Sequence, residues 1–299
     1  MKHGSLCFNF NCSYKCIVAK TMHFFCISEN MINSTFVLSE QREVIANSSA
    51  VKSLVSVLEA LKNSQSPLLF YGEKGSGRCF FAKYLHKCSQ NCDSVFMRLN
   101  CKTLSVEFLT ELLETKPEML HFDEIDESST ELQIFLLENI EKYSCRFSFS
   151  SEKNLEDLVD DGSFSRGFFN LISNLPVNVP PLRQRKEDIE DLSNMFLQIF
   201  SKKYNKHFTG FSDEALNLLK NSFWSGNFLE FSSCIENACF NAPPPVIERE
   251  HLRLNSLNIL PVSDNLNDSD KSLKSAVDRF KKQYILQIVG ILRFIYKHL

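Results

Sequence analysis

The sequence predicts an α/β domain built on a parallel sheet, followed by a smaller helical domain. Short apolar runs typical of buried parallel strands cover residues 68–71, 95–99, 119–122, 146–149 and 177–179. Helical patterns alternate with these runs, at residues 80–88, 106–113, 132–143 and 155–159. This alternation indicates a sheet with helices on both faces.

The second domain begins where the strands stop. After Pro180-Pro181, amphipathic helical patterns cover residues 187–202, 212–221 and 227–239. A further helix, with Ser48 or Ser49 as its cap, precedes the first strand. We therefore expect five segments: a poorly structured arm, the α/β domain, a helical domain, a linker and a basic amphipathic helix, at residues 1–43, 44–182, 183–245, 246–271 and 272–299.

Composition excludes several classes of protein. The 299 residues are 43% hydrophobic and 23% charged, which excludes a wholly disordered or fibrous chain. The net charge of −3 excludes a chain-wide basic field for nucleic acid. Residues 271–299 nevertheless hold seven Lys and Arg against one Asp, so weak, non-specific DNA contact is expected there if anywhere.

The N-terminal residues and the cysteines indicate a cytoplasmic protein. There is no signal-peptide pattern, and the longest apolar stretch, residues 284–296, is too short and too polar to span a membrane. Eleven cysteines in such a chain are expected to be reduced. A zinc site among the N-terminal cysteines and His23 stays open as an alternative, although their spacing fits no paired-ligand pattern.

A glycine-rich loop follows the first strand. Three of the nine glycines, Gly72, Gly75 and Gly77, fall within six residues between an apolar strand and a helical pattern. Glycines let backbone N–H groups surround a phosphate, and the helix adds its positive N-terminal end. The usual motif ends in Lys-Ser or Lys-Thr, whereas this loop ends in Arg78-Cys79. Arginine keeps the charge on a larger group, and a thiol is a poor substitute for a hydroxyl ligand of Mg²⁺. A glycine-rich turn without a ligand remains the alternative.

Two carboxylates follow the third strand. Residues 119–122 are apolar apart from His121, and Asp123-Glu124 comes directly after them. At the carboxyl edge of a sheet, the first carboxylate can hold Mg²⁺ and the second can orient an attacking water. An acidic turn is the alternative, because Asp126 and Glu127 continue the run. His121 is expected to be a packed side chain.

Residues 44–257, about seventy per cent of the chain, resemble the AAA+ domain of sigma-54-dependent transcription activators, the bacterial enhancer-binding proteins. The glycine loop is similar to the family's GESGTG and residues 122–125 to its LDEI. Residues 99–101 are similar to VNC, residues 180–189 to PPLRERREDI and residues 224–227 to WPGN. The resemblance implies an AAA+ P-loop NTPase fold with a small helical lid, and Walker A and Walker B motifs at the loop and at Asp123-Glu124.

The sequence departs from the family at the positions that the family uses for sigma-54 contact, ATP hydrolysis and DNA binding. The stretch between Cys101 and Asp123 is too short for the GAFTGA loop that contacts sigma-54. The two arginine fingers align with Ser165 and Leu171, with Arg166 nearby. The lid arginine aligns with Leu229, and the sensor residue falls at Ser151 or Glu152. The turn and recognition helix of the family's DNA-binding helix-turn-helix domain are expected to be missing after residue 288. These departures predict impaired hydrolysis and no remodelling of sigma-54.

The resemblance also implies the site and its ligands. ATP is expected to bind at the loop residues Gly72, Glu73, Lys74, Gly75, Ser76, Gly77, Arg78, Cys79 and Phe80. Mg²⁺ is expected on Asp123, through the nucleotide, and Glu124 is expected to polarise water.

Four functions fit the sequence. The first is an ATP-binding transcription regulator that is at most a weak ATPase. The second is a pseudo-ATPase that acts by associating with itself or with related AAA+ subunits. A decaying gene product and a DNA-binding regulator that uses the basic C-terminal residues are the others.

Overall fold

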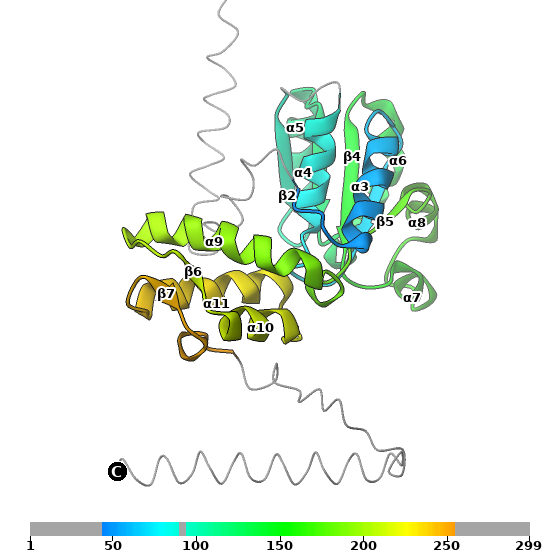
Figure 1. The fold of residues 1–299 in the computed structure, drawn as a ribbon. Coiled ribbons are helices and arrows are strands. Elements are labelled where there is room, and N and C mark those ends of the chain that lie inside the picture. The colour runs from blue at the N-terminus through cyan, green and yellow to red at the C-terminus, as the bar shows by residue number, and fades with distance from the viewer. Residues whose placement is uncertain (1–43, 90–93, 255–299) are drawn as a thin grey trace, which may run out of the picture. The chain divides into compact units, whose positions relative to one another are not determined.

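The computed structural model describes residues 44–89 and 94–254. The predicted arm, the basic helix at 272–299 and the N-terminal cysteines lie outside these residues. The first part is an α/β domain (Figure 1) with strands β1 (Leu68–Tyr71), β2 (Phe96–Asn100), β3 (Met119–Asp123), β4 (Arg146–Ser151) and β5 (Pro176–Asn178). Its helices are α3 (Ser49–Leu61), α4 (Arg78–Cys88), α5 (Val106–Glu114), α6 (Thr130–Asn139), α7 (Leu155–Asp160) and α8 (Arg166–Ile172). No helix within the described ranges is long and apolar enough to cross a membrane.

The five strands form one parallel sheet in the order β2-β3-β4-β1-β5. The predicted α/β class and parallel sheet are therefore confirmed. The register places Asn100 beside Asp123 and Tyr71 beside Ser151. Because the strands are parallel, the residues that follow β1, β2, β3 and β4 meet at the carboxyl edge of the sheet.

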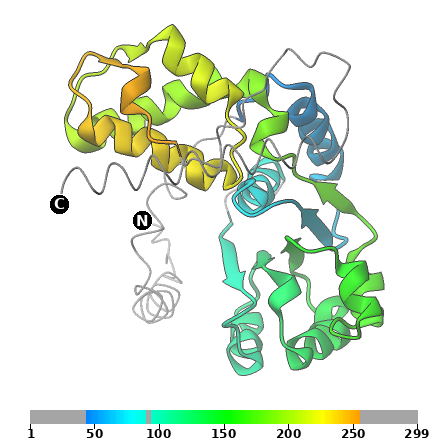
Figure 2. The ribbon, with the colours of Figure 1, turned by 90° about the horizontal axis from the view of Figure 1, so that it is seen from below.

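Helices cover both faces of the sheet, as Figure 2 shows. Helices α3 and α4 pack on the face that presents Leu68, Phe70 and Val177. Helices α5, α6, α7 and α8 pack on the face that presents Leu69, Phe122 and Phe149. The alternation of Leu68, Leu69 and Phe70 between the two clusters shows why this strand is apolar throughout.

The start of α3 is attached to the second domain. Ser48 caps the helix, since its Oγ accepts a hydrogen bond from Val51 N. Asp188 lies directly before α9 (Ile189–Tyr204), and its carboxylate accepts bonds from Ser48 N at 2.8 Å and Ser48 Oγ at 2.7 Å. Arg185 Nε also donates to Asp188 Oδ2, at 3.2 Å. This buried group holds the residues before α3 against the second domain.

The second domain is a helical lid of α9, α10 (Asp213–Asn221) and α11 (Asn227–Asn241). Trp224, fully buried, lies in its core and donates from Nε1 to Leu219 O at 2.8 Å. The two-residue strands β6 (Gly210–Phe211) and β7 (Val246–Ile247) pair beside the helices. The lid thus continues past residue 245, where we expected a linker, because Ile247 and Leu252 are buried in its core.

Candidate functional site

The glycine loop connects β1 directly to α4. Gly75 and Gly77 have φ values of +75° and +100°, in the left-handed region that glycine adopts without strain. A Cβ on Gly75 would also lie 2.7 Å from the carbonyl oxygen of Gly226. Gly77 is the N-cap of α4 and supplies no side-chain cap, so the first N–H groups of this 11-residue helix are available to an anion.

Arg78 and Cys79 begin α4 and differ from the residues of the usual motif. Arg78 is buried, and its Nη1 donates to the carbonyl oxygen of Gly72, so the side chain folds back onto its own loop. Burial raises the pKa of the Cys79 thiol to about 11. The thiol is therefore protonated at neutral pH and is a poor ligand for a hard cation.

Asp123 is buried at the carboxyl end of β3 and is held from two sides. Arg98 on β2 donates to Asp123 Oδ2 from Nε, at 2.9 Å, and from Nη2. Ser150 Oγ on β4 donates to Oδ1. Burial alone would raise the pKa of Asp123, but Arg98 and the Ser150 hydrogen bond outweigh it and lower the pKa to about 2.

Glu124 lies beside this ion pair at the sheet edge. Its backbone is left-handed, with φ of 57°, and its Oε2 accepts a hydrogen bond from Asn100 Nδ2 at 3.3 Å. The predicted pair of carboxylates therefore has two different environments. Asp123 is buried and ion-paired, whereas Glu124 is half-buried and held by a neutral amide.

One pocket, of about 190 Å³, brings these groups together. Its charged end is made by the loop and the strand ends, and its lining includes Lys74, Gly75, Gly77, Arg78, Cys79, Phe80, Arg98, Asp123 and Glu124. Its other end is largely apolar and is lined from outside the sheet by Val44, Ile45, Arg185, Leu192, Met195, Phe196, Phe228, Leu229 and Ser232. An anionic group fits the first end and an aromatic ring the second.

The lid is bonded to the glycine loop. Arg183 donates from Nη1 to Glu73 Oε2 at 2.6 Å and from Nη2 to Glu73 Oε1 at 2.5 Å. Asn227 Nδ2 donates to Glu73 Oε2 at 3.1 Å and to Lys74 O at 3.0 Å, and Phe228 N donates to Gly75 O at 3.1 Å. Glu73 thus faces the lid rather than the pocket.

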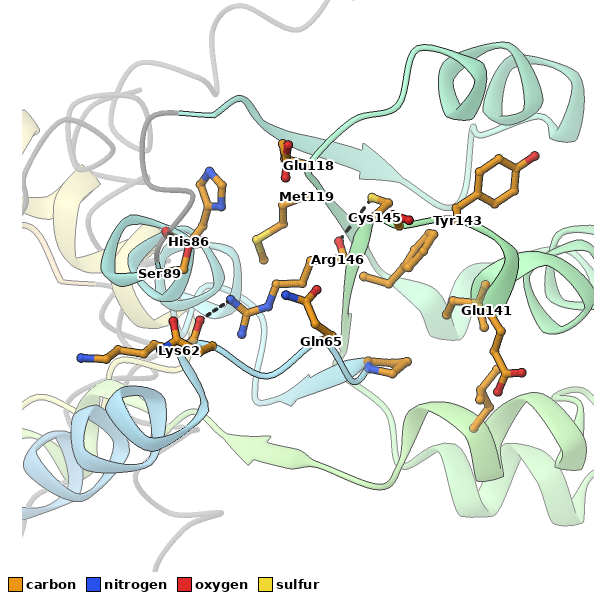
Figure 3. Close-up of a pocket in the computed structure, with 16 residues that line it drawn as sticks. Lys62, Gln65, His86, Ser89, Glu118, Met119, Glu141, Tyr143, Cys145 and Arg146 are labelled. Atoms are coloured by element: carbon orange, nitrogen blue, oxygen red, sulfur yellow. Dashed lines mark hydrogen bonds between the residues drawn. The ribbon is translucent and has the colours of Figure 1, made fainter.

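A larger pocket, of about 620 Å³, lies at the opposite edge of the sheet (Figure 3). Its lining includes the first residues of β3 and β4, Met119 and Arg146. Arg146 donates to the carbonyl oxygens of Lys62 and Leu61, both at 2.8 Å, and so stabilises the C-terminal end of α3. Neither the glycine loop nor the Asp123-Glu124 pair lines this pocket, so it is not the candidate site.

Comparison with known proteins agrees with this geometry. Residues 45–182 match the model of the Sigma-54 interaction domain, and residues 183–267 match that of the AAA+ ATPase lid domain. The Nif-specific regulatory protein of Rhizobium leguminosarum bv. trifolii is 30% identical over an alignment of 243 residues, which covers 70% of this chain and 69% of that protein.

The chain belongs to the sigma-54-interaction family of AAA+ proteins. The regulatory protein AtoC of Escherichia coli K12 is 26% identical over 82% of this chain and 61% of its own length. The solved structure of Brucella abortus NtrX in complex with ADP has a TM-score of 0.65, with 22% identity over 95% of this chain and 71% of that one. A structure of the same protein with ATP has a TM-score of 0.64. These structures confirm the AAA+ P-loop fold with its helical lid.

The structure brings together most of the predicted site residues of this family member. Lys74, Gly75, Gly77, Arg78, Cys79 and Phe80 line the pocket with Asp123 and Glu124. Gly72, Glu73 and Ser76 support the loop instead: Gly72 accepts from Arg78, Glu73 binds the lid and Ser76 is buried. Their roles toward a ligand stay predictions.

The residues at Asp123 do not fit a magnesium ion. Both oxygens of Asp123 already accept hydrogen bonds, and the neighbouring Cys79 is a protonated thiol. In the part of the chain that the structure describes, no group of three or more His, Cys, Asp or Glu could hold a metal. Asp123 is therefore assigned no magnesium ion.

The positions of the family's arginines hold other side chains. Ser165 caps α8, and Leu171 packs against the core of the α/β domain. Arg166 is exposed and pairs with Asp160 at 3.0 Å. Leu229 lines the pocket where the family has its lid arginine.

Arg98 and Ser150 are site residues without a sequence motif. Arg98 lies in a strand with no special pattern, and Ser150 lies one residue before the expected sensor position. Ser151 bonds to Lys153 O at 2.7 Å and Asp126 Oδ1 at 3.2 Å instead of Asp123. The alternation of Phe and Ser along residues 147–150 is the one pattern that places Ser150 on a polar row.

Proposed function

We propose that this chain is an AAA+ protein of the sigma-54-interaction type that binds an adenine nucleotide between its glycine loop and its lid, and that hydrolyses ATP slowly at most. The observation that supports this most strongly is the pocket with Gly75, Gly77 and the start of α4 at its charged end. Phosphates fit the charged end, and an adenine ring fits the apolar end that Val44, Ile45 and Phe228 line. The NtrX structures, which hold ADP and ATP, support the same ligand class.

Slow hydrolysis follows from the residues available for the transition state. Glu124 is placed to polarise a water, but Ser165 and Leu171 cannot stabilise developing charge on a neighbour's nucleotide. An arginine finger contributes roughly 10³–10⁵ in rate. The arginine closest to these positions in sequence, Arg166, is paired on the surface with Asp160.

A pair of glycine variants tests nucleotide binding. Gly77→Ala and Gly162→Ala both force an alanine into a left-handed backbone, and a Cβ meets nothing closer than 3.8 Å at either position. Both should therefore lose similar stability, about 1–2 kcal/mol. Gly77→Ala alters the loop at the head of α4, so binding of a fluorescent ADP analogue should weaken by about tenfold, the equivalent of one hydrogen bond to a charged group. Gly162→Ala should bind like wild type, and equal affinities would refute the site.

The partners proposed are further copies of this chain or related AAA+ subunits. Without a glycine-bearing loop between β2 and β3, where the described chain has the nine-residue helix α5, sigma-54 is not a proposed partner. Contact with DNA is proposed to be weak and non-specific. An open-complex assay with sigma-54 polymerase and ATP should show no activity above background.

A pseudo-ATPase that acts through association is the second candidate. It is favoured by the combination of a retained nucleotide pocket with missing arginines at Ser165, Leu171 and Leu229. The ATPase rate of an intact related subunit, measured with and without this chain, would distinguish the two: the second candidate requires mixed oligomers in which that rate changes, although this chain alone hydrolyses no ATP.

A further inference from the structure

The guanidinium of Arg98 forms an ion pair with the carboxylate of Asp123 at the sheet edge. Arg98 pairs in register with His121, two residues before Asp123 on the neighbouring strand, so its long side chain runs along the sheet to reach Asp123. Nε lies 2.9 Å from Asp123 Oδ2, and Nη2 donates to the same oxygen. Since the other oxygen accepts from Ser150, both oxygens of the carboxylate are bonded to protein donors.

Arg98 also faces the pocket. Its side chain is 50% exposed whereas that of Asp123 is 8% exposed, so the arginine covers the buried carboxylate and presents its own charge outward. Within the described residues, Nη1 makes no hydrogen bond. A planar guanidinium that uses two nitrogens on a carboxylate can use the third on a phosphate oxygen.

The charge balance of the pocket is already cationic without a metal. Its lining contains Lys74, Arg78, Arg98 and Arg185 against the carboxylates of Asp123 and Glu124. Arg185 is paired at 3.2 Å with Asp188, a carboxylate that does not line the pocket. Three cations therefore remain against two carboxylates, and an anion can enter without bringing a divalent cation.

We propose that Arg98 replaces the divalent cation at this site, so that the chain binds its nucleotide as the metal-free anion. This inference rests on the proposed nucleotide site. A protonated thiol at Cys79 removes the hydroxyl that would have been the loop's ligand for Mg²⁺, and the Arg98–Asp123 ion pair removes the carboxylate. Both positions have therefore lost a ligand that a magnesium site would need. The positive charge that a magnesium ion would supply is here carried by the guanidinium of Arg98.

Titration of the wild-type chain of residues 1–299 tests the inference without any substitution. The probe is ADP with a fluorescent label on the ribose, added in buffer with excess Mg²⁺ and in buffer with excess EDTA. The expected dissociation constants agree within about twofold, well below the tenfold change of a lost charged contact. A dissociation constant that is tenfold or more higher in EDTA overturns the inference and leaves the proposed function standing. Absence of binding in both buffers overturns both.

Three variants identify the residue responsible. In Arg98→Met, affinity in EDTA should fall by about tenfold, because Asp123 then faces the phosphates uncovered, and Mg²⁺ should restore part of it. Arg98→Lys keeps a cation and should bind alike in both buffers. Arg249→Met is the matched control, since Arg249 is exposed on the lid and does not line the pocket.

The variants also separate a charge effect from a merely structural one. If Arg98 only maintains the fold, Arg98→Met will weaken binding equally with Mg²⁺ and with EDTA, and that outcome overturns the inference. If Arg98→Met does not fold, which circular dichroism will show, the wild-type titration and Arg98→Lys decide. A dissociation constant of Arg98→Lys that is tenfold or more higher in EDTA than in Mg²⁺ would also contradict the inference.

Discussion

Arg183 at the start of the lid holds both carboxylate oxygens of Glu73 in the glycine loop, at 2.6 and 2.5 Å. The hydrogen bonds lower the pKa of Glu73, with Arg183 as the largest cause. Asn227 adds a third bond to the same carboxylate at 3.1 Å. Three segments that are far apart in the sequence, the loop, residues 180–189 and residues 224–227, therefore meet at one group.

Arg183→Lys should loosen the lid and weaken nucleotide binding by about three- to tenfold, since an ammonium cannot bind both oxygens in the same plane. The pair is partly exposed, so the loss of stability should stay below about 1 kcal/mol. Arg166→Lys is the matched control because the Arg166–Asp160 pair is on the surface and outside the pocket lining. Equal nucleotide affinities in the two variants would show that this contact does not position the loop.

Arg78→Lys should tighten nucleotide binding by about tenfold without producing an active ATPase. The Arg78 side chain is engaged with its own loop at Gly72 O, whereas a compact ammonium can reach the phosphates. Hydrolysis should remain slow because Ser165 and Leu171 supply none of the roughly 10³–10⁵ that an arginine finger contributes. Steady-state ATPase assays of wild type and variant measure this.

The control for that experiment is Arg78→Lys combined with Arg166→Ala. Both proteins should show the same low turnover, because Arg166 is paired with Asp160. Turnover of order 1 s⁻¹ in the single variant, typical of working enzymes, that is lost in the double variant would establish Arg166 as a working finger.

His121 should make the fold sensitive to mild acid. It is fully buried in β3, and burial lowers its pKa from 6.5 to about 4, so the folded protein holds it neutral. The unfolded chain takes up this proton first, and stability is lost as pH falls from 6.5 toward 4. The shift corresponds to at most about 3 kcal/mol.

Urea unfolding of wild type and His121→Gln at several pH values measures this effect. The difference between their free energies of unfolding should change by up to about 3 kcal/mol over that window. His207→Gln, at an exposed lid position, is the control. A constant difference between wild type and His121→Gln would contradict the assignment of a neutral, buried imidazole.

The lid core should include residues beyond its third helix. Ile247→Ala removes a fully buried side chain and should lower the free energy of unfolding by about 2–4 kcal/mol. Ile134→Ala, at a side chain that is 48% exposed, should cost less than about 1 kcal/mol. Denaturant midpoints compare the two, and similar losses would mean that residues 246–254 are not part of the lid.

The sheet and the site's position could be predicted because local patterns carry them. Each strand is an apolar run, and strand ends with Gly72 or Asp123 must meet at one edge of a parallel sheet. Helix α8 was not predicted, since Gly167 in its first turn is a poor helix former and no long apolar stripe follows it. The helix expected at residues 132–143 ends as an α-helix at Asn139 and continues as a 3₁₀ helix over residues 140–142. The apolar pattern of such a short segment does not distinguish the two kinds of helix.

The contacts that decide the chemistry could not be predicted, because they join residues whose proximity depends on register. Arg98 reaches Asp123 only when β2 pairs with β3 as observed, and a shift of one residue would turn it to the other face. The lid was expected to end at residue 245, after the run Pro243-Pro244-Pro245, because consecutive prolines cannot continue a helix. The two-residue strand β7 that follows gives no pattern of its own.

The chemical fate of bound ATP tests the central claim most directly. The protein would be saturated with ATP, freed of excess nucleotide by rapid gel filtration, held at 25 °C for an hour and denatured, and the released nucleotide would be identified by ion-exchange chromatography. We predict close to one nucleotide per chain, most of it still ATP. Release of ADP alone would contradict slow hydrolysis, and recovery of no nucleotide would contradict the binding site itself.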